Sequence, residues 1–278
     1  MPELPEVETI ARGLARRVTG EIIESVWLGQ KKEPLKSSAR EIAAALEQSR
    51  IAAVRRMGKH IVFDLDRAAN GGKPARRKQE KGAQWIVHLG MTGSLRICEP
   101  QTDVAKHTHA ILKLSSGREL RFVDPRRFGR LSVSTKFDAA GIEPLEVDLD
   151  RFVTLFRGRK TPIKSALLNQ NLLRGVGNIY ADESLFRAGL RPRRRASSIT
   201  REQLGKLFLA VKEVLTEAIA LGGSSISDYV GAEGEEGFFQ LQHRVYGREG
   251  ERCLICKTRI KRVVIAGRSS HYCPRCQK

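Results

Sequence analysis

The segments Cys253-Leu-Ile-Cys256 and Cys273-Pro-Arg-Cys276 lie near the end of the sequence, and together they read C-x2-C-x16-C-x2-C. Two C-x2-C turns at this spacing are typical of a closed tetrahedral zinc site with four thiolate ligands. Between them, residues 257–272 carry the apolar run 263–265 before Gly267, as a β-hairpin would. Because so short a segment buries too little apolar surface to fold alone, the sequence predicts a zinc ribbon that is folded by one structural Zn2+.

The alternative for these four cysteines is a pair of disulfide bonds. A fifth cysteine, Cys98, would then be left over, and residues 1–17 are too charged for the apolar core of a secretory signal. Cys98 stands in an apolar, strand-like context, which favours a small core residue over a metal ligand. Zinc is therefore favoured over disulfides, and with it a reducing, cytoplasmic location.

The composition is strongly basic. The 278 residues hold 50 Lys and Arg against 31 Asp and Glu, which gives a formal charge of +19 and a pI near 10.2. Residues 151–278 hold 24 basic against 11 acidic residues, whereas residues 1–150 hold 26 against 20. Such an excess favours a polyanionic partner, of which nucleic acid is the most obvious. No apolar run approaches the roughly 20 residues that span a bilayer, so we expect no membrane partner.

Hydrophobic periodicity divides the chain into a β-rich part and a helical part. Residues 5–18 place apolar side chains on one helical face, with Glu6 in the first turn and basic residues near the end. A second, short helix is expected at residues 39–48. The β-like runs have the spacing of an antiparallel β-sandwich. They are residues 22–28, 51–57, 60–65, 85–91, 94–98, 109–114, 119–124 and 130–134.

After residue 150 the periodicity becomes helical, and Thr200 followed by Gln203 is a capping-box signal for the longest helix. The expected helices span residues 150–156, 162–169, 178–188 and 200–220. We therefore expect an α+β multidomain fold. Its parts are a domain with an N-terminal helix and an antiparallel β-sandwich (1–133), a linker (134–150), a helical domain (151–242) and a terminal zinc-finger β-hairpin (243–278).

Two basic segments have more than one reading. Residues 67–84 are rich in Gly, Lys and Arg, which predicts a flexible insertion between two strands, with added phosphate contacts as the alternative. The run Arg191 and Arg193 to Arg195 is either a solvated surface loop or a set of phosphate contacts.

The segment Arg174-Gly-Val-Gly-Asn178 leads into a predicted helix, with Asn178 as the expected N-cap. Free backbone amides at such a turn can hold a phosphate, and ordinary helix capping is the alternative. The basic neighbours Arg159, Lys160 and Lys164 favour the phosphate.

The N-terminus carries a possible nucleophile. Removal of Met1 would leave Pro2 with a free secondary amine, which can attack an acetal-like C1′ carbon and form an iminium. Glu3 and Glu6 follow where they could transfer protons, at the start of a helix whose dipole favours their charged forms. On composition alone, a plain helix-start signal is the favoured interpretation of these residues.

Six motifs, in order along the whole chain, carry a resemblance to a known family. They are Pro2-Glu-Leu-Pro-Glu-Val-Glu8, His88-Leu-Gly-Met-Thr-Gly-Ser-Leu-Arg96, Asp124-Pro-Arg-Arg-Phe-Gly129, Gly175-Val-Gly-Asn-Ile-Tyr180, Val245-Tyr-Gly-Arg248 and the zinc ribbon. The chain resembles the bacterial formamidopyrimidine-DNA glycosylases, and Leu4 with Val7 is more similar to this branch than to the endonuclease VIII branch. The resemblance implies a bifunctional base-excision repair enzyme that removes 8-oxoguanine and formamidopyrimidines and then nicks the strand by β,δ-elimination.

The same resemblance implies roles for individual residues. Pro2 would be the Schiff-base nucleophile, Glu3 the acid that assists base departure, and Glu6 a supporting carboxylate. Lys59 would donate a proton in β-elimination, and Arg268 would hold phosphate and assist δ-elimination. The implied void-filling residues, which replace the extruded nucleotide, are Met91, Arg126 and Phe128. The implied DNA-binding residues are His88, His107, Arg126, Arg127, Arg159, Lys164 and Asn178.

The resemblance further implies a helix-two-turn-helix DNA-binding domain, in which a loop at about residues 222–240 covers the flipped base. Ser227 stands where relatives often carry a basic residue, and this loop also carries Glu233, Glu235 and Glu236. We expect a monomer, associated with the nucleoid, whose partner is double-stranded DNA with oxidised bases or abasic sites. The alternatives are an endonuclease VIII-like enzyme for oxidised pyrimidines and a non-catalytic zinc-ribbon protein that binds damaged DNA.

Overall fold

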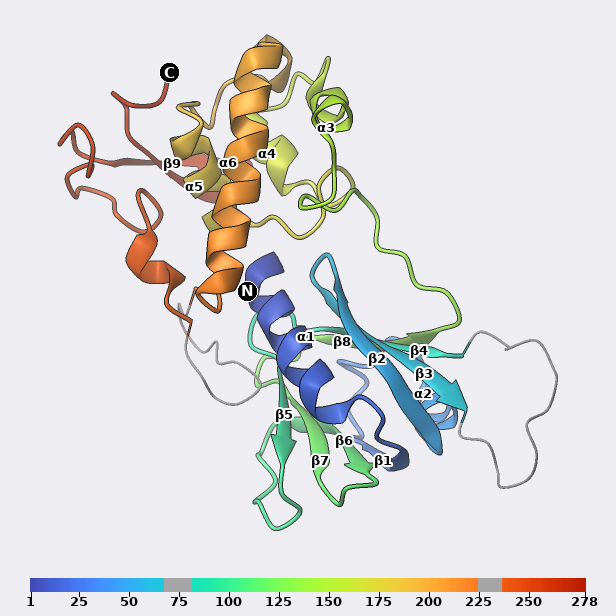
Figure 1. The fold of residues 1–278 in the computed structure, drawn as a ribbon. Coiled ribbons are helices and arrows are strands. Elements are labelled where there is room, and N and C mark those ends of the chain that lie inside the picture. The colour runs from blue at the N-terminus through green and yellow to red at the C-terminus, as the bar shows by residue number, and fades with distance from the viewer. Residues whose placement is uncertain (68–81, 225–236) are drawn as a thin grey trace. The chain divides into compact units, whose positions relative to one another are not determined.

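The computed structural model describes residues 1–67, 82–224 and 237–278, which form two compact units (Figure 1). Of the described residues, the N-terminal unit holds 1–2, 6–138 and 237, and the C-terminal unit holds 3–5, 139–224 and 238–278. Most of the predicted insertion at 67–84 lies outside the described residues. The same holds for most of the predicted loop at 222–240, including Ser227, Glu233, Glu235 and Glu236.

Among its described residues, the N-terminal unit is an antiparallel β-sandwich with two helices, as predicted. One sheet has the strand order β2-β3-β4-β8 and the other has β1-β6-β7-β5. Apolar residues from both sheets and from helix α1 (Leu4–Val18) form one buried cluster. The strands are β1 (Ile23–Leu28), β2 (Ser49–Met57), β3 (His60–Arg67), β4 (Gln84–His88), β5 (Ser94–Cys98), β6 (Thr108–Leu114), β7 (Glu119–Val123) and β8 (Arg130–Ser134).

Local sequence signals explain these elements. Helix α2 (Ala39–Leu46) begins with a capping box, in which the side chains of Ser38 and Glu41 each accept the other's backbone N–H. Strand β7 is buried along its whole length because it pairs with β6 on one edge and β5 on the other. It therefore forms a rigid base for the loops that follow β4 and β7.

The C-terminal unit contains four α-helices among its described residues, and their apolar faces form its core. They are α3 (Leu149–Phe156), α4 (Ile163–Leu168), α5 (Asn178–Arg187) and α6 (Arg201–Ala220), with short 3-10 helices at Ala196–Ser198 and Phe239–Gln242. The predicted capping box of Thr200 and Gln203 is present at the start of α6. The predicted N-cap of α5 was wrong: Gly177 is the N-cap, and Asn178 is the first helical residue.

The zinc-ribbon segment forms the predicted hairpin, with β9 (Lys261–Ile265) paired antiparallel to β10 (Arg268–Tyr272). Ala266 and Gly267 make the two-residue turn between the strands, and both have positive φ, as such hairpin turns require. The turn places Arg268 at the first position of β10, where it is exposed.

Candidate active site and metal centre

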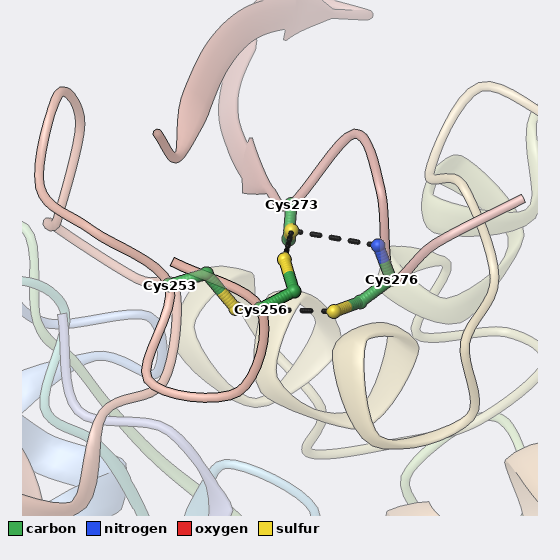
Figure 2. Close-up of side chains that lie close together, drawn as sticks. All are labelled: Cys253, Cys256, Cys273 and Cys276. Atoms are coloured by element: carbon green, nitrogen blue, oxygen red, sulfur yellow. Dashed lines mark hydrogen bonds between the residues drawn. The ribbon is translucent and has the colours of Figure 1, made fainter. Parts of the chain in front are cut away.

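The four ribbon cysteines converge on one point (Figure 2). Their sulfur atoms all lie within 4.8 Å of one another, with 3.9 Å between Cys253 and Cys276 and 3.3 Å between Cys256 and Cys273. Disulfide sulfurs lie about 2.0 Å apart, so the disulfide alternative does not fit. Four thiolates at about 2.3 Å from a tetrahedral zinc ion would be spaced as observed. The residues thus fit one structural zinc ion, and its chemistry would be to hold the hairpin in place.

The first residues of the chain are held at the start of helix α5. The backbone N–H of Ile179 donates to Oε1 of Glu3 at 3.2 Å, and the N–H of Leu4 donates to the carbonyl oxygen of Gly175 at 3.0 Å. A Cβ atom on Gly177 would lie 2.2 Å from Cδ of Glu3, and one on Gly175 would lie 2.8 Å from the Leu4 side chain. The two glycines are therefore required by close approach.

One backbone amide at the start of helix α5 is bound by a carboxylate of the chain itself. Of the amides predicted to cradle a phosphate, that of Ile179 is used by Glu3, which is only 4% exposed. A carboxylate at a helix N-terminus is stabilised by the helix dipole. The turn thus fixes the position of an acidic side chain directly after Pro2, which is half-buried.

In the N-terminal unit, contacts from Arg56 hold the turn that precedes Lys59. Lys59 follows Gly58 in the tight turn between β2 and β3 and is 9% exposed. Arg56 donates to the carbonyl oxygen of Gly58 at 3.2 Å and to Glu8 of helix α1 at 2.6 Å. Burial alone would raise the pKa of Glu8, but hydrogen bonds and charges from Arg56 and Arg12 outweigh burial and lower it. Glu6, in the first turn of α1, is also buried.

The predicted void-filling residues lie on two loops joined by one carboxylate. Asp124 is fully buried and accepts from Thr92 Oγ1 at 2.6 Å, from the N–H of Arg126 at 3.2 Å and from the N–H of Gly129 at 2.8 Å. Thr92 follows Met91 in the loop after β4, so Asp124 couples this loop to its own turn. The turn also contains Arg127 at a positive φ of 56°.

The side chains at the tips of these loops are exposed. Met91 is 44% exposed and Phe128 is 51% exposed, and the Arg126 guanidinium lies 4.9 Å from the centre of the Phe128 ring. A Cβ on Gly90 would lie 2.4 Å from the backbone of Phe128, so only glycine lets the loops approach so closely. Exposed apolar side chains on a rigid turn suit insertion between bases.

His88, at the end of β4, is half-buried and pairs in register with His60 of β3. The N–H of Gly90 donates to Nδ1 of His88 at 3.1 Å, which leaves Nε2 to carry the proton of the neutral ring. Burial, followed by the charges of His60, Arg130 and Lys59, lowers the pKa of His88 to about 4. His88 is therefore a neutral N–H donor near pH 7.

The other predicted DNA contacts fall into two groups. His107, Arg127 and Arg159 are exposed, whereas Asn178 is half-buried and donates to Ser269 Oγ at 3.3 Å. Lys164 is 0% exposed, so its ammonium group does not face solvent as a phosphate contact would. Direct binding of phosphate by Lys164 stays a prediction that this conformation does not favour.

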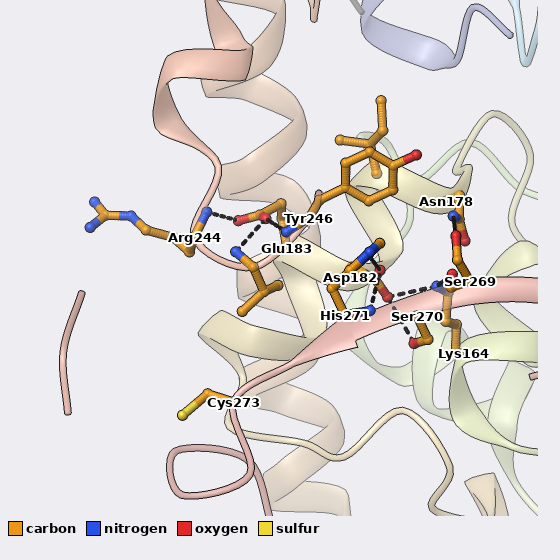
Figure 3. Close-up of polar contacts among 12 residues, drawn as sticks. Lys164, Asn178, Asp182, Glu183, Arg244, Tyr246, Ser269, Ser270, His271 and Cys273 are labelled. Atoms are coloured by element: carbon orange, nitrogen blue, oxygen red, sulfur yellow. Dashed lines mark hydrogen bonds and ion pairs between the residues drawn. The ribbon is translucent and has the colours of Figure 1, made fainter. Parts of the chain in front are cut away.

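Sequence reasoning missed a buried polar network around Lys164 (Figure 3). Its ammonium lies 2.7 Å from Asp182, which also accepts from the N–H of His271 at 2.8 Å. The neighbouring Glu183 accepts three backbone N–H groups, those of residues 244, 245 and 246, at 2.8–2.9 Å. Burial raises the pKa of Glu183, although these three hydrogen bonds oppose the rise. No spacing signal in the sequence marks Asp182 or Glu183.

The arginine run at 191–195 has a third role that neither reading anticipated. Arg191 donates to the carbonyl oxygens of Gln277 and Pro274 at 2.9 and 3.0 Å, and Arg193 donates to that of Val264 at 3.3 Å. Guanidinium groups thus bind the backbone of the zinc ribbon.

Comparison with known proteins agrees with this geometry. Three family models match in order: the formamidopyrimidine-DNA glycosylase N-terminal domain over residues 1–131, the formamidopyrimidine-DNA glycosylase H2TH domain over residues 140–230, and a zinc finger found in FPG and IleRS over residues 250–278. The formamidopyrimidine-DNA glycosylase of Solibacter usitatus (strain Ellin6076) is 47% identical over 286 aligned residues, which cover all of both chains.

Solved structures give the same result. The MutM (FPG) protein from Thermus thermophilus is 41% identical, with a TM-score of 0.84 over 99% of this chain and 98% of that chain. A Lactococcus lactis FPG variant in complex with DNA containing Fapy-dG is 30% identical, with a TM-score of 0.85 over the whole of both chains. The chain belongs to the formamidopyrimidine-DNA glycosylase family. None of its described helices is both long and apolar enough to cross a membrane.

Proposed function

We propose that Pro2, Glu3, Lys59 and Arg268 carry out excision of an oxidised purine and the strand cleavage that follows. The chain is a base-excision repair DNA glycosylase with AP lyase activity, and its partner is DNA that contains oxidised bases or abasic sites. The observation that carries the assignment of residues is the binding of Glu3 in the Gly175–Gly177 turn. It places a buried acid next to a residue whose freed amine would be a nucleophile.

The reaction begins once Met1 has been removed from Pro2. The Pro2 nitrogen bonds to C1′ as the bond to the base breaks, and opening of the sugar ring leaves a positively charged iminium. The departing base and the ring oxygen each take up a proton: the attacking amine gives up one, and Glu3 donates the other. The iminium then withdraws the electrons that remain when C2′ loses a proton, and the bond from C3′ to oxygen breaks in β-elimination.

Two cations complete strand cleavage. Lys59 donates a proton during β-elimination. Arg268 holds the remaining phosphate and assists the δ-elimination that breaks the bond from C5′ to oxygen. Because Arg268 follows the hairpin turn of the ribbon, a zinc ion held by the four cysteines would support this role by keeping β10 folded.

DNA binding combines phosphate contacts with extrusion of the damaged nucleotide. His88, His107, Arg127, Arg159 and Asn178 are the proposed phosphate contacts, and Lys164 acts from within the protein. Met91, Arg126 and Phe128 fill the space that the flipped nucleotide leaves. Because each cationic contact releases a counterion, affinity falls steeply as salt increases. We propose a monomer in the cytoplasm, associated with the nucleoid.

Borohydride trapping tests the nucleophile. The protein is incubated with a duplex containing 8-oxoguanine, the adduct is reduced, and the cross-linked N-terminal peptide is identified by mass spectrometry. We expect an adduct on residue 2, and tight binding with no adduct would overturn the assignment of Pro2. A parallel duplex with thymine glycol tests the endonuclease VIII-like preference, which would give faster excision there.

Glu3→Gln provides the matched variant. It should lose excision of 8-oxoguanine yet still nick a preformed abasic site, because only the first step needs its proton. Normal excision by this variant would remove Glu3 from the mechanism.

A further inference from the structure

Strand β10 is held by side chains of the helical domain immediately after Arg268. Lys164 of α4 donates to the carbonyl oxygen of Ser269 at 2.6 Å. Asp182 of α5 accepts from Ser270 Oγ at 3.0 Å and from the backbone N–H of His271 at 2.8 Å. Three consecutive residues of the strand are thus held by two neighbouring helices (Figure 3).

Asp182 is the centre of these contacts. One carboxylate oxygen binds the Lys164 ammonium and the Ser270 hydroxyl, and the other binds the His271 amide and lies 3.3 Å from Nδ1 of His271. Both the Lys164 and Asp182 side chains are 0% exposed. A buried carboxylate with these partners is held in a single orientation, because any other orientation would leave a charge unpaired.

Lys164 needs this partner to remain charged. Burial lowers the pKa of Lys164, and Asp182 opposes that effect through its charge and its hydrogen bond. Glu3 and Arg268 also act electrostatically on Lys164, in opposite directions, so these three groups belong to one charged neighbourhood of the C-terminal unit. Without Asp182, the ammonium that binds Ser269 would lack its closest anion.

We propose that Asp182 is a positioning residue for strand cleavage: through Lys164, Ser270 and His271 it fixes β10 so that the Arg268 guanidinium is aimed at the phosphate during δ-elimination. The proposal rests on the function proposed above for Arg268. Asp182 itself does not touch the substrate. Its effect should fall on the δ step more than on excision of the base, because the contacts it makes lead to the strand that carries Arg268.

The test uses a duplex with a preformed abasic site, on which the β and β,δ products separate by electrophoresis. Asp182→Asn should lower the rate of the δ step by between about tenfold and about a hundredfold, the effect of a displacement of about 1 Å. The rate of 8-oxoguanine excision in a single turnover should change by less than about threefold. Ser184→Ala is the matched control, because Ser184 is buried in the same helix and its hydroxyl has no hydrogen-bond partner among the described residues.

The variant Arg268→Ala separates a failure of the role proposed for Arg268 from a failure of the role proposed for Asp182. Arg268→Ala must abolish the δ product; if it does not, the proposed role of Arg268 fails rather than that of Asp182. If Arg268→Ala abolishes the δ product and Asp182→Asn leaves the product ratio unchanged, the positioning role is wrong.

Should Asp182→Asn fail to fold, as judged by its zinc content, Ser270→Ala removes one contact to Asp182 without changing charge. It should shift the product ratio about twofold in the same direction. An unchanged ratio in folded Ser270→Ala would also overturn the proposal.

Discussion

Asp124 in the N-terminal unit and Glu183 in the C-terminal unit are both buried carboxylates that accept backbone N–H groups, but they act over very different distances along the chain. Asp124 binds amides two and five residues ahead of it, within its own turn. Glu183 binds amides 61 to 63 residues ahead, in the segment that leads to the zinc ribbon. The backbone contacts of Asp124 are local, and its side-chain contact with Thr92 spans 32 residues, whereas all three backbone contacts of Glu183 span 61 to 63 residues.

Because the contacts of Asp124 and Glu183 differ in range, we expect their loss to destabilise the two units differently. If the turn closed by Asp124 is disrupted, the sandwich core should remain folded, because the buried apolar cluster contains no residue of that turn. The segment bound by Glu183 leads into the ribbon, whose small cluster of buried apolar residues depends on two of the cysteines. Removing the zinc ion, the Glu183 carboxylate or the Asp124 carboxylate one at a time, and measuring the loss of stability, tests this expectation.

Removal of zinc should have the largest effect. Chelation, or Cys256→Ser, removes an ion that supplies about 10–16 kcal/mol in isolated zinc-finger peptides, so the ribbon should unfold. Hydrogen exchange should show that β9 and β10 lose protection while β7 keeps it. Cys98→Ser is the control, since Cys98 is a free thiol outside the cluster. Protected ribbon amides without zinc would contradict the prediction.

Glu183→Gln should have the next largest effect on stability. Three backbone N–H groups would face an amide that can accept at one oxygen only, which should lower the free energy of unfolding by about 3–5 kcal/mol. Thermal and urea unfolding would measure the loss. Glu213→Gln, an exposed position on α6, should change stability by less than about 0.5 kcal/mol. Equal losses for the two variants would show that the long-range links contribute little.

Asp124→Asn should lower the free energy of unfolding by a smaller amount, about 2 kcal/mol. The new amide can still accept at its oxygen, and the Thr92 hydroxyl can turn to accept from its nitrogen. Urea unfolding of Asp124→Asn and of Glu183→Gln under the same conditions measures the difference between their free energies of unfolding. A larger loss for Asp124→Asn would reverse the comparison between the units.

The same contrast explains what could be predicted from the sequence. The eight strands, the capping box at Thr200 and the ribbon hairpin follow from local patterns, and the structure confirms them. The Asp124 turn belongs to a short motif, so the resemblance singled out Arg126 and Phe128 without knowledge of their partners.

Long-range contacts could not be predicted in this way. Asp182 and Glu183 lie in an ordinary helical pattern, and their hydrogen-bond partners in residues 244–271 are 61 to 89 residues away. Asn178 was wrongly predicted as an N-cap because its local sequence cannot show that Glu3, 176 residues before Ile179, binds at that helix end. The arginines at 191–195 looked like a charged surface, because their targets are carbonyl oxygens near the end of the sequence.

The pH dependence of His88 should produce a smaller effect. Its pKa in the folded protein is about 4, below the ordinary value of 6.5, so the neutral ring stabilises the fold fully above pH 6.5. As pH falls from 6.5 toward 4, the unfolded chain binds the proton first, and stability from this group is lost. Between pH 7.5 and pH 5 we expect a loss of about 1.5 kcal/mol.

His88→Asn isolates this contribution, because its side-chain oxygen can still accept the N–H of Gly90. The variant should lose about 1.5 kcal/mol less stability than the unaltered protein between the two pH values, as measured by urea unfolding. Identical pH profiles would show that His88 is not buried as a neutral ring.

Phe128→Ala should change stability least, by less than about 0.5 kcal/mol, because the ring is already half exposed. Excision of 8-oxoguanine should nevertheless fall by about tenfold or more, since Met91 and Arg126 alone would not fill the space in the duplex. Single-turnover kinetics beside a thermal unfolding curve separate the two effects. A destabilised variant with normal excision would make Phe128 a structural residue.

The zinc centre has a chemical consequence for an enzyme that repairs oxidative damage. Thiolates are oxidised by peroxide, and two of the four ligands, Cys256 and Cys276, are only partly buried. The reagents that create the substrate in DNA can therefore attack the metal site of the ribbon whose hairpin carries Arg268. Under severe oxidative stress, we expect zinc release to reduce repair capacity while lesions accumulate, and a zinc-sensitive dye during peroxide titration would record that threshold.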